Sequence, residues 1–226
     1  MVEHSLYAYM NELLSRVPIQ FIRYKYSKIH WESKLIGIVG PRGIGKSTML
    51  LQHILSHKEE GSHLYVSADN MYFANHTIYD LADDFVKEGG THLYIDEVHK
   101  YKDWSKELKH INDIHQNLHV IFTGSSVLDI LEGEADLSRR AIIYSMQGLS
   151  FREYLDLFHN IKASTYSLEE ILNDSVLARE YAGGKCLVYR LTMDDYHRYH
   201  YLDSGFIKRH YKIKGELHTV RPISEK

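Results

Sequence analysis

A glycine-rich stretch at residues 40–48 has the residue types and spacing of a phosphate-binding loop. It reads Gly-Pro-Arg-Gly-Ile-Gly-Lys-Ser-Thr and fits the pattern G-x-x-x-x-G-K-[ST]. An apolar run at 35–39 precedes it and a helix-like run at 49–55 follows, which is the strand, loop and helix context that this motif needs. Glycines let backbone N–H groups converge on an anion, and a helix beginning near Lys46 adds about half a positive charge. The motif therefore predicts that the protein binds a nucleoside triphosphate.

All nine residues of this loop are candidate contacts to the nucleotide. Lys46 is expected to reach the β- and γ-phosphates, and Ser47 is expected to bind Mg²⁺ through its hydroxyl oxygen. The alternative is a glycine-rich turn that binds nothing, and it is disfavoured because both flanks of the motif are correct. The predicted nucleotide contacts are Gly40, Pro41, Arg42, Gly43, Ile44, Gly45, Lys46, Ser47 and Thr48.

Two carboxylates, Asp96 and Glu97, follow the apolar run at 92–95. Open parallel sheets bind ligands at the carboxyl ends of their strands, so we expect Asp96 to hold Mg²⁺ through its water shell. Glu97 lies one step further out and is predicted to polarise the attacking water as the catalytic base, a role that P-loop kinases do not need. The alternative is a pair of acids that ends a strand at a solvated rim.

Hydrolysis of a γ-phosphate also needs positive charge where negative charge builds up, and an aligned water. Ser125, in the Thr-Gly-Ser-Ser stretch at 123–126, is a candidate sensor of the γ-phosphate or the water, although this turn could equally cap the next helix. Arg139 or Arg140 could act as an arginine finger across the interface of a homo-oligomer. The sequence does not choose between the two arginines, nor between that role and a solvated basic pair.

Strand-like and helix-like runs alternate along the chain, which predicts an α/β protein with a parallel sheet covered on both faces. After the phosphate-binding loop, strands are expected at 63–67, 92–95, 119–122 and 141–144. Helices are expected at 5–17, 78–86, 101–111 and 127–131. Two S-x-x-E capping boxes, at 150–153 and 167–170, predict further helices near 151–159 and 168–181.

Basic and aromatic residues alternate in the segment 21–31. This pattern suits a nucleic-acid surface, on which aromatic rings stack on bases and cations hold phosphates. It also suits an edge segment whose tyrosine rings pack on the core, and we favour this second interpretation.

Composition narrows the remaining classes of function. The formal net charge of −3 gives no general case for a nucleic-acid or membrane partner, and the longest apolar runs are only strand-sized. Cys186 is the single cysteine and the first residues lack a secretory pattern, so a cytoplasmic location is expected. His197 and His200 are only three residues apart and are weak evidence for a metal site.

The motifs together resemble the predicted AAA-type ATPases of archaea and bacteria that carry the AAA_14 domain. The resemblance covers about residues 8–180 and rests on the stretches 35–48, 93–99 with Trp104, 122–126, 136–140 and 149–154. It implies a P-loop NTPase three-layer sandwich with five parallel strands in the order 5-1-4-3-2, followed by a helical lid. It also implies ATP and Mg²⁺ as the ligands.

This resemblance divides the chain and sets the expected function. Such proteins normally continue through a full lid to a nuclease-like domain, whereas here the similarity fades after about residue 180. The function expected is Mg²⁺-dependent ATP hydrolysis coupled to a conformational change in a partner or oligomer. The alternatives are a nucleotide-gated switch or scaffold with little turnover, or a P-loop kinase. The expected parts are an amino-terminal helix with a lead-in segment (1–33), the ATPase core (34–150), a partial helical lid (151–184) and a divergent, foreign or frame-shifted tail (185–226).

Overall fold

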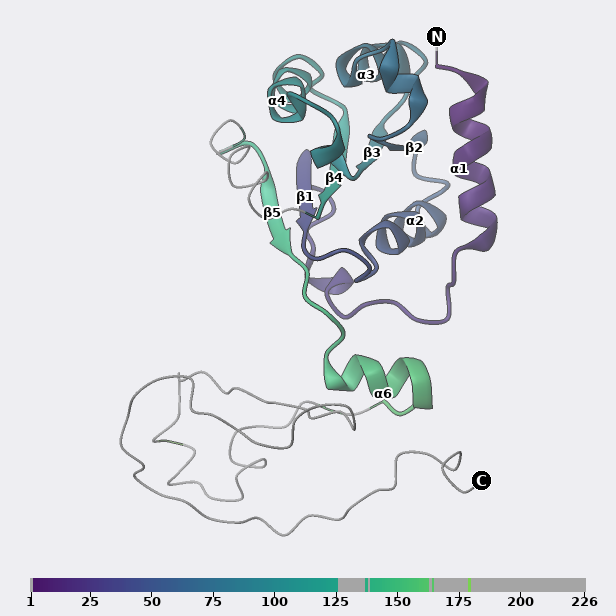
Figure 1. Cartoon of the computed structure of the whole chain (residues 1–226), viewed down its shortest axis with the longest axis vertical. Coiled ribbons are helices and arrows are strands. Elements are labelled where there is room, and N and C mark those ends of the chain that lie inside the picture. The colour runs from purple at the N-terminus through teal and green to yellow at the C-terminus, as the bar shows by residue number, and fades with distance from the viewer. Residues whose placement is uncertain (1, 126–136, 138, 163, 165–178, 180–226) are drawn as a thin grey trace. The chain divides into compact units, whose positions relative to one another are not determined.

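The computed structural model describes residues 2–125, 137, 139–162, 164 and 179 (Figure 1). The chain divides into two units, Met1–Thr165 and Tyr166–Lys226. Every element named below belongs to the first unit. The helix predicted at 127–131 lies outside the described residues, as do Cys186, His197 and His200, and of the helix predicted at 168–181 only residue 179 is described.

A five-stranded parallel sheet forms the centre of the first unit (Figure 1). Its strand order is β2-β3-β4-β1-β5, which confirms the expected order 5-1-4-3-2 read from the other edge. β1 is buried at all five positions, as expected for a strand covered on both faces. The strands are β1 (Leu35–Val39), β2 (His63–Ser67), β3 (His92–Asp96), β4 (His119–Gly124) and β5 (Ile142–Ser145).

Helices connect and cover these strands near the places that the apolar periodicity and the caps predict, except that the helix expected at 101–111 is observed at Trp104–Ile114, because Tyr101 has an extended backbone. In α6, the Ser150 side chain accepts a hydrogen bond from the Glu153 backbone N–H, so the predicted capping box is present. The α-helices are α1 (His4–Arg16), α2 (Lys46–Ser56), α3 (Ile78–Lys87), α4 (Trp104–Ile114) and α6 (Phe151–His159). Short 3₁₀ helices are η1 (Tyr26–Lys28), η2 (Met71–Ala74) and η3 (Val98–Lys100).

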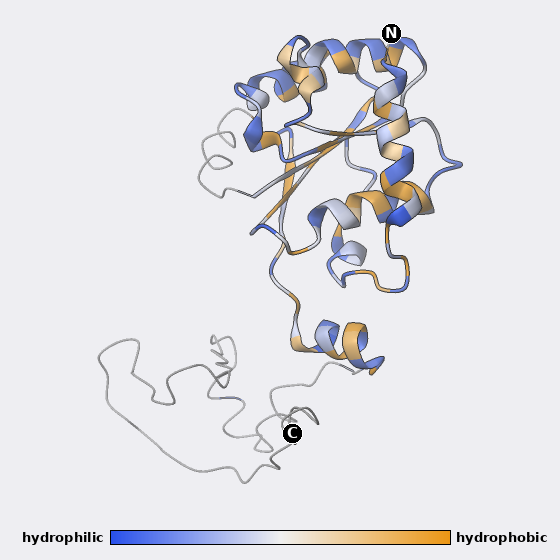
Figure 2. Ribbon diagram, turned by 45° about the vertical axis from the view of Figure 1, so that its right-hand side comes forward, coloured by the Kyte–Doolittle hydropathy of each residue, from blue (hydrophilic) through white to orange (hydrophobic). Residues whose placement is uncertain are grey.

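Two apolar clusters lie on opposite faces of the sheet, because side chains alternate along each strand. Phe85 of α3 and Leu108 of α4 belong to the first cluster, and Leu50 of α2 belongs to the second. Figure 2 shows apolar residues running along the strands between these helical layers. The result is a three-layer sandwich in which α2, and with it the phosphate-binding loop, lies on the same face as Tyr65 of β2.

The basic and aromatic segment at 21–31 packs on this α2 face. The Trp31 ring stacks on His53 of α2 with a centroid separation of 3.9 Å, and the Tyr26 ring lies 5.0 Å from Trp31. Arg23 is buried rather than presented to solvent. This packing agrees with the interpretation as an edge segment, and nucleic-acid binding by these residues stays a prediction.

Candidate phosphate-binding site

The glycine-rich loop runs from the end of β1 to the first residue of α2. Gly43 and Gly45 have φ angles of 79° and 93°, in the left-handed region that glycine adopts without strain. Gly40 is confined in a different way, because a Cβ there would collide with the carbonyl oxygen of Met146. The Met146 N–H in turn donates to the Val39 carbonyl at 2.7 Å. The loop is therefore held against the residues that follow β5.

Lys46 lies across this loop and is only 6% exposed. Its Nζ donates to the carbonyl oxygens of Gly40 at 2.7 Å and Pro41 at 2.8 Å. Burial lowers the pKa of Lys46, while the nearby carboxylates of Asp96 and Glu97 act in the opposite direction. The ammonium group thus contacts neutral carbonyls, and a phosphate oxygen is a stronger partner that could replace them.

Asp96 ends β3 with its carboxylate buried and fully hydrogen-bonded. The hydroxyl of Tyr65 donates to Oδ2 at 2.6 Å, and the hydroxyl of Thr123 donates to Oδ1. The backbone N–H of Glu97 also donates to Oδ1, at 3.2 Å. Because both oxygens have partners, the orientation of this carboxylate is fixed before any ligand arrives.

The two residues expected to bind Mg²⁺ share Tyr65 as a partner. Burial and then the Asp96 carboxylate raise the pKa of Tyr65, while a hydrogen bond with Ser47 acts the other way. The hydroxyl of Ser47 and the carboxylate of Asp96 are the hard oxygen ligands that Mg²⁺ prefers. No described group of three or more His, Cys, Asp or Glu is placed to hold a metal. Mg²⁺ usually needs only one or two carboxylates beside waters and phosphates, so Ser47 and Asp96 fit it.

Glu97 follows Asp96 in a left-handed conformation, with φ of 53°. Its backbone N–H donates to the hydroxyl of Thr123 at 3.1 Å as well as to Asp96. This conformation is uncommon for a residue with a Cβ, and here it directs the chain from β3 into η3. Among the residues that the structure describes, none donates a hydrogen bond to the Glu97 carboxylate, whose charge acts on Lys46.

Thr123 and Ser125 at the end of β4 have different partners. Thr123 is completely buried and contacts both Asp96 and the Glu97 N–H, whereas the Ser125 hydroxyl lies 3.0 Å from His99 Nε2. The sequence analysis singled out Ser125 but not Thr123, His99 or Tyr65. Thr123 and Tyr65 could have been found from the sequence, because each is a polar residue within an otherwise apolar strand.

The two candidate arginine fingers differ in their contacts. Arg140 forms a two-point ion pair with Asp113 of α4, through Nε at 2.8 Å and Nη2 at 3.1 Å. Arg139 is exposed, has a φ of 71° and makes no hydrogen bond to a described residue. Arg140 is therefore held by Asp113, whereas Arg139 has no hydrogen-bond partner among the residues that the structure describes.

The sheet order and the loop geometry define an α/β protein with the P-loop NTPase fold. A family model described as AAA domain, AAA_14, matches residues 32–155. This match spans more than half of the chain, and the chain belongs to that family. The resemblance found in the motifs is confirmed for this part of the sequence.

A second family model, described as phosphatidylserine decarboxylase, matches residues 148–226. The sequence analysis did not anticipate it. The "Phosphatidylserine decarboxylase proenzyme 2" of Clostridium acetobutylicum is 56% identical over 71 residues, 31% of this chain and 24% of that protein. The proenzyme of Ruminiclostridium cellulolyticum is 53% identical over 64 residues, 28% of this chain and 21% of that protein. The chain thus spans less than a quarter of the length of these relatives.

Similar solved structures include the Saccharomyces cerevisiae Hsp104–ADP complex, with a TM-score of 0.49, 18% identity, and coverage of 66% of this chain and 26% of that one. AMPPCP-bound DnaA from Aquifex aeolicus has a TM-score of 0.39 and 17% identity, and covers 80% of this chain and 61% of that one. The family assignment rests on the sequence match and the fold on the strand order. None of the described helices has the length and apolarity to cross a membrane.

Proposed function

We propose that the core at 34–150 binds ATP with Mg²⁺ and hydrolyses its γ-phosphate. The observation that supports this most is the meeting of Lys46, Ser47 and Asp96 at the carboxyl edge of the sheet, beside the carboxylate of Glu97. Lys46 interacts electrostatically with both acids, and Tyr65 donates to Asp96 and lies near Ser47. A glycine-rich turn without a ligand would not need this arrangement.

On binding, the loop N–H groups and the first turn of α2 would hold the phosphates. Lys46 would exchange the carbonyls of Gly40 and Pro41 for phosphate oxygens. Ser47 and Asp96 would hold Mg²⁺, which supplies positive charge to the phosphates. Asp96 needs no rearrangement for this role, because Tyr65 and Thr123 already fix its carboxylate.

Glu97 would take a proton from the attacking water, since its carboxylate accepts no hydrogen bond from a described residue. Ser125 would sense the γ-phosphate through the hydroxyl that now contacts His99. Arg139 would supply positive charge to a neighbouring copy in a homo-oligomer, and we prefer it to Arg140, which is paired with Asp113. The nucleotide state would then be coupled to a change in the oligomer or a partner.

Calorimetry with MgATP and a phosphate-release assay on the full chain test this proposal. Binding of MgATP together with release of phosphate supports ATP hydrolysis. Lys46→Ala should abolish the binding of MgATP. Binding without release would favour the nucleotide-gated switch, and label on a small molecule instead of free phosphate would favour the kinase. Absence of ATP binding to well-folded protein in the presence of Mg²⁺ would refute the assignment.

The match at 148–226 favours a second candidate function for that part of the chain, phosphatidylserine decarboxylation. This match overlaps the expected helical lid at 151–184 and the expected tail at 185–226. The division of the chain into these two parts stays a proposal. Release of CO₂ from phosphatidylserine vesicles by the full chain would support this candidate. If the folded protein releases no CO₂, residues 148–226 resemble the decarboxylases in sequence but lack their activity.

A further inference from the structure

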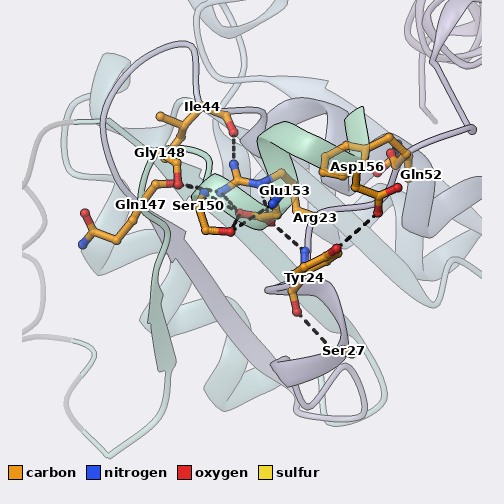
Figure 3. A network of polar contacts seen from close by, with 11 residues as sticks. Arg23, Tyr24, Ser27, Ile44, Gln52, Gln147, Gly148, Ser150, Glu153 and Asp156 are labelled. Atoms are coloured by element: carbon orange, nitrogen blue, oxygen red, sulfur yellow. Dashed lines mark hydrogen bonds and ion pairs between the residues drawn. The ribbon is translucent and has the colours of Figure 1, made fainter. Parts of the chain in front are cut away.

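One buried side chain, that of Arg23, joins the lead-in segment to the phosphate-binding loop and to residues 147–153, three parts that are far apart in sequence (Figure 3). Its Nη1 donates to the carbonyl of Ile44 in the phosphate-binding loop at 2.5 Å. Its Nη2 donates to the carbonyls of Gln147 and Gly148, after β5, at 2.9 and 3.0 Å. Its Nε forms an ion pair with Glu153 of α6 at 2.8 Å, across 130 residues of sequence.

Glu153 is held as firmly as Arg23. Its carboxylate also accepts hydrogen bonds from the backbone N–H groups of Tyr24 and Ser150, both at 2.8 Å, and from the Ser150 hydroxyl at 3.0 Å. Burial alone raises the pKa of Glu153, but the hydrogen bonds from Arg23, Ser150 and Tyr24 outweigh it and lower the pKa to about 2. The carboxylate therefore stays charged at neutral pH, and the pair is an ionic link between the lead-in segment and α6.

The contact with Ile44 has a consequence for the loop. The Ile44 carbonyl and the Gly45 N–H belong to one trans peptide unit, in which they point in opposite directions. Because Arg23 holds the carbonyl, the Gly45 N–H points away from Arg23. Gly45 has a φ of 93° and no side chain, so nothing in the residue itself fixes this orientation. The Gly45 N–H directly precedes α2 and is one of the amides that a phosphate-binding loop uses.

We propose that Arg23 is a positioning residue that fixes the 44–45 peptide unit for phosphate binding and links this loop to the start of α6. The proposal rests on ATP binding at residues 40–48. By reciprocity, a nucleotide that needs this orientation stabilises the Arg23–Glu153 link, and loss of the link weakens nucleotide binding. A change in structure on nucleotide binding would thus be transmitted to residues 147–158 through the guanidinium group of Arg23.

The test uses the full chain, and combines MgATP affinity with amide hydrogen exchange over 147–158. In the wild-type protein, MgATP should slow exchange in this segment. Arg23→Lys keeps the charge but cannot reproduce the three-way contact of a guanidinium, and it should raise the Kd for MgATP about tenfold. It should also remove the effect of MgATP on exchange. Arg16→Lys, in the exposed pair with Glu12 of α1, is the control and should change neither.

A purely structural role would lower the thermal stability of Arg23→Lys but leave the MgATP-dependent protection intact, and that result would overturn the proposal. Wild-type protein that binds MgATP without protection at 147–158 would overturn it as well. Wild-type protein that binds no MgATP would instead refute the proposed ATP binding, so the two failures are distinguishable. If Arg23→Lys does not fold, Glu153→Gln provides the same comparison, because Gln also suits the capping box; unchanged Kd and protection in that variant would refute the link.

Discussion

The Tyr65 hydroxyl donates to the Asp96 carboxylate at 2.6 Å from the neighbouring strand β2. We expect Tyr65→Phe to raise the Mg²⁺ concentration for half-maximal phosphate release severalfold, because the ring stays but the carboxylate is no longer held at Oδ2. Tyr94→Phe is the matched control, since Tyr94 is the register partner of Tyr65 but contacts His63 instead. An equal Mg²⁺ dependence in both variants would contradict this role.

The Glu97 carboxylate, which accepts no hydrogen bond within the described part of the chain, leads to a second prediction. Glu97→Gln should lower the turnover of ATP by about 10²–10⁴-fold, the usual contribution of a general base, and leave the Kd for MgATP within about twofold of the wild-type value. Single-turnover phosphate release and calorimetry on the same sample measure the two effects. Normal phosphate release would remove Glu97 from this role.

The different contacts of Arg139 and Arg140 separate the two candidate fingers. Arg139→Ala should lower turnover by about 10³-fold or more if it acts across an interface, whereas Arg140→Ala should have a much smaller effect. A mixture of Arg139→Ala and Glu97→Gln proteins should recover part of the activity, because one supplies the site and the other the arginine. A loss of activity in Arg139→Ala that mixing does not restore would contradict action in trans.

The buried ion pair between Arg23 and Glu153 makes the free energy of unfolding depend on pH within a defined range. The folded-state pKa of Glu153 is about 2, below its usual value of 4.5, so its contribution is present above pH 4.5 and is lost as the pH falls towards 2. Urea unfolding of wild-type and Glu153→Gln proteins should therefore differ more at pH 6 than at pH 2.5. A constant difference over this range would mean that the folded-state pKa is not lowered.

His53 makes the stability depend on pH in a second range, at higher pH than Glu153. Burial foremost, and then the neighbouring histidines His57, His92 and His63, lower the pKa of His53 to about 3 from the usual 6.5. Below pH 6.5 the unfolded chain therefore binds a proton at His53 that the folded chain does not. As a result, the free energy of unfolding decreases as the pH falls below 6.5. His53→Gln should reduce the dependence of the urea midpoint on pH between 6.5 and 4. An unchanged slope would show that His53 protonates in the folded protein.

Local patterns predicted much of the fold, and the roles of the site residues stay predictions. The loop motif predicted a turn that leads into α2 near Lys46, and the capping box at Ser150 predicted α6 with the observed bounds. These features depend on residues close together in sequence, where glycine conformation and helix periodicity leave few choices. The strand order came from the resemblance to a known family.

Contacts between distant segments could not be predicted in this way. Arg23 was part of a basic and aromatic pattern, and nothing near it in sequence indicates that its partner is Glu153. The same holds for Arg140 and Asp113, which made the two arginines indistinguishable in the sequence. Both pairings depend on how strands and helices stack, which periodicity does not specify.

The residues just after β5 contact the glycine-rich loop at two points, through the Met146 N–H that donates to the Val39 carbonyl beside Gly40 and through the Gln147 and Gly148 carbonyls that share Arg23 with Ile44. A shortened protein that stops when the last strand is complete would lose both supports, although its sheet would be whole. If the core binds ATP as proposed, its smallest autonomous fragment is expected to extend through the first turn of α6.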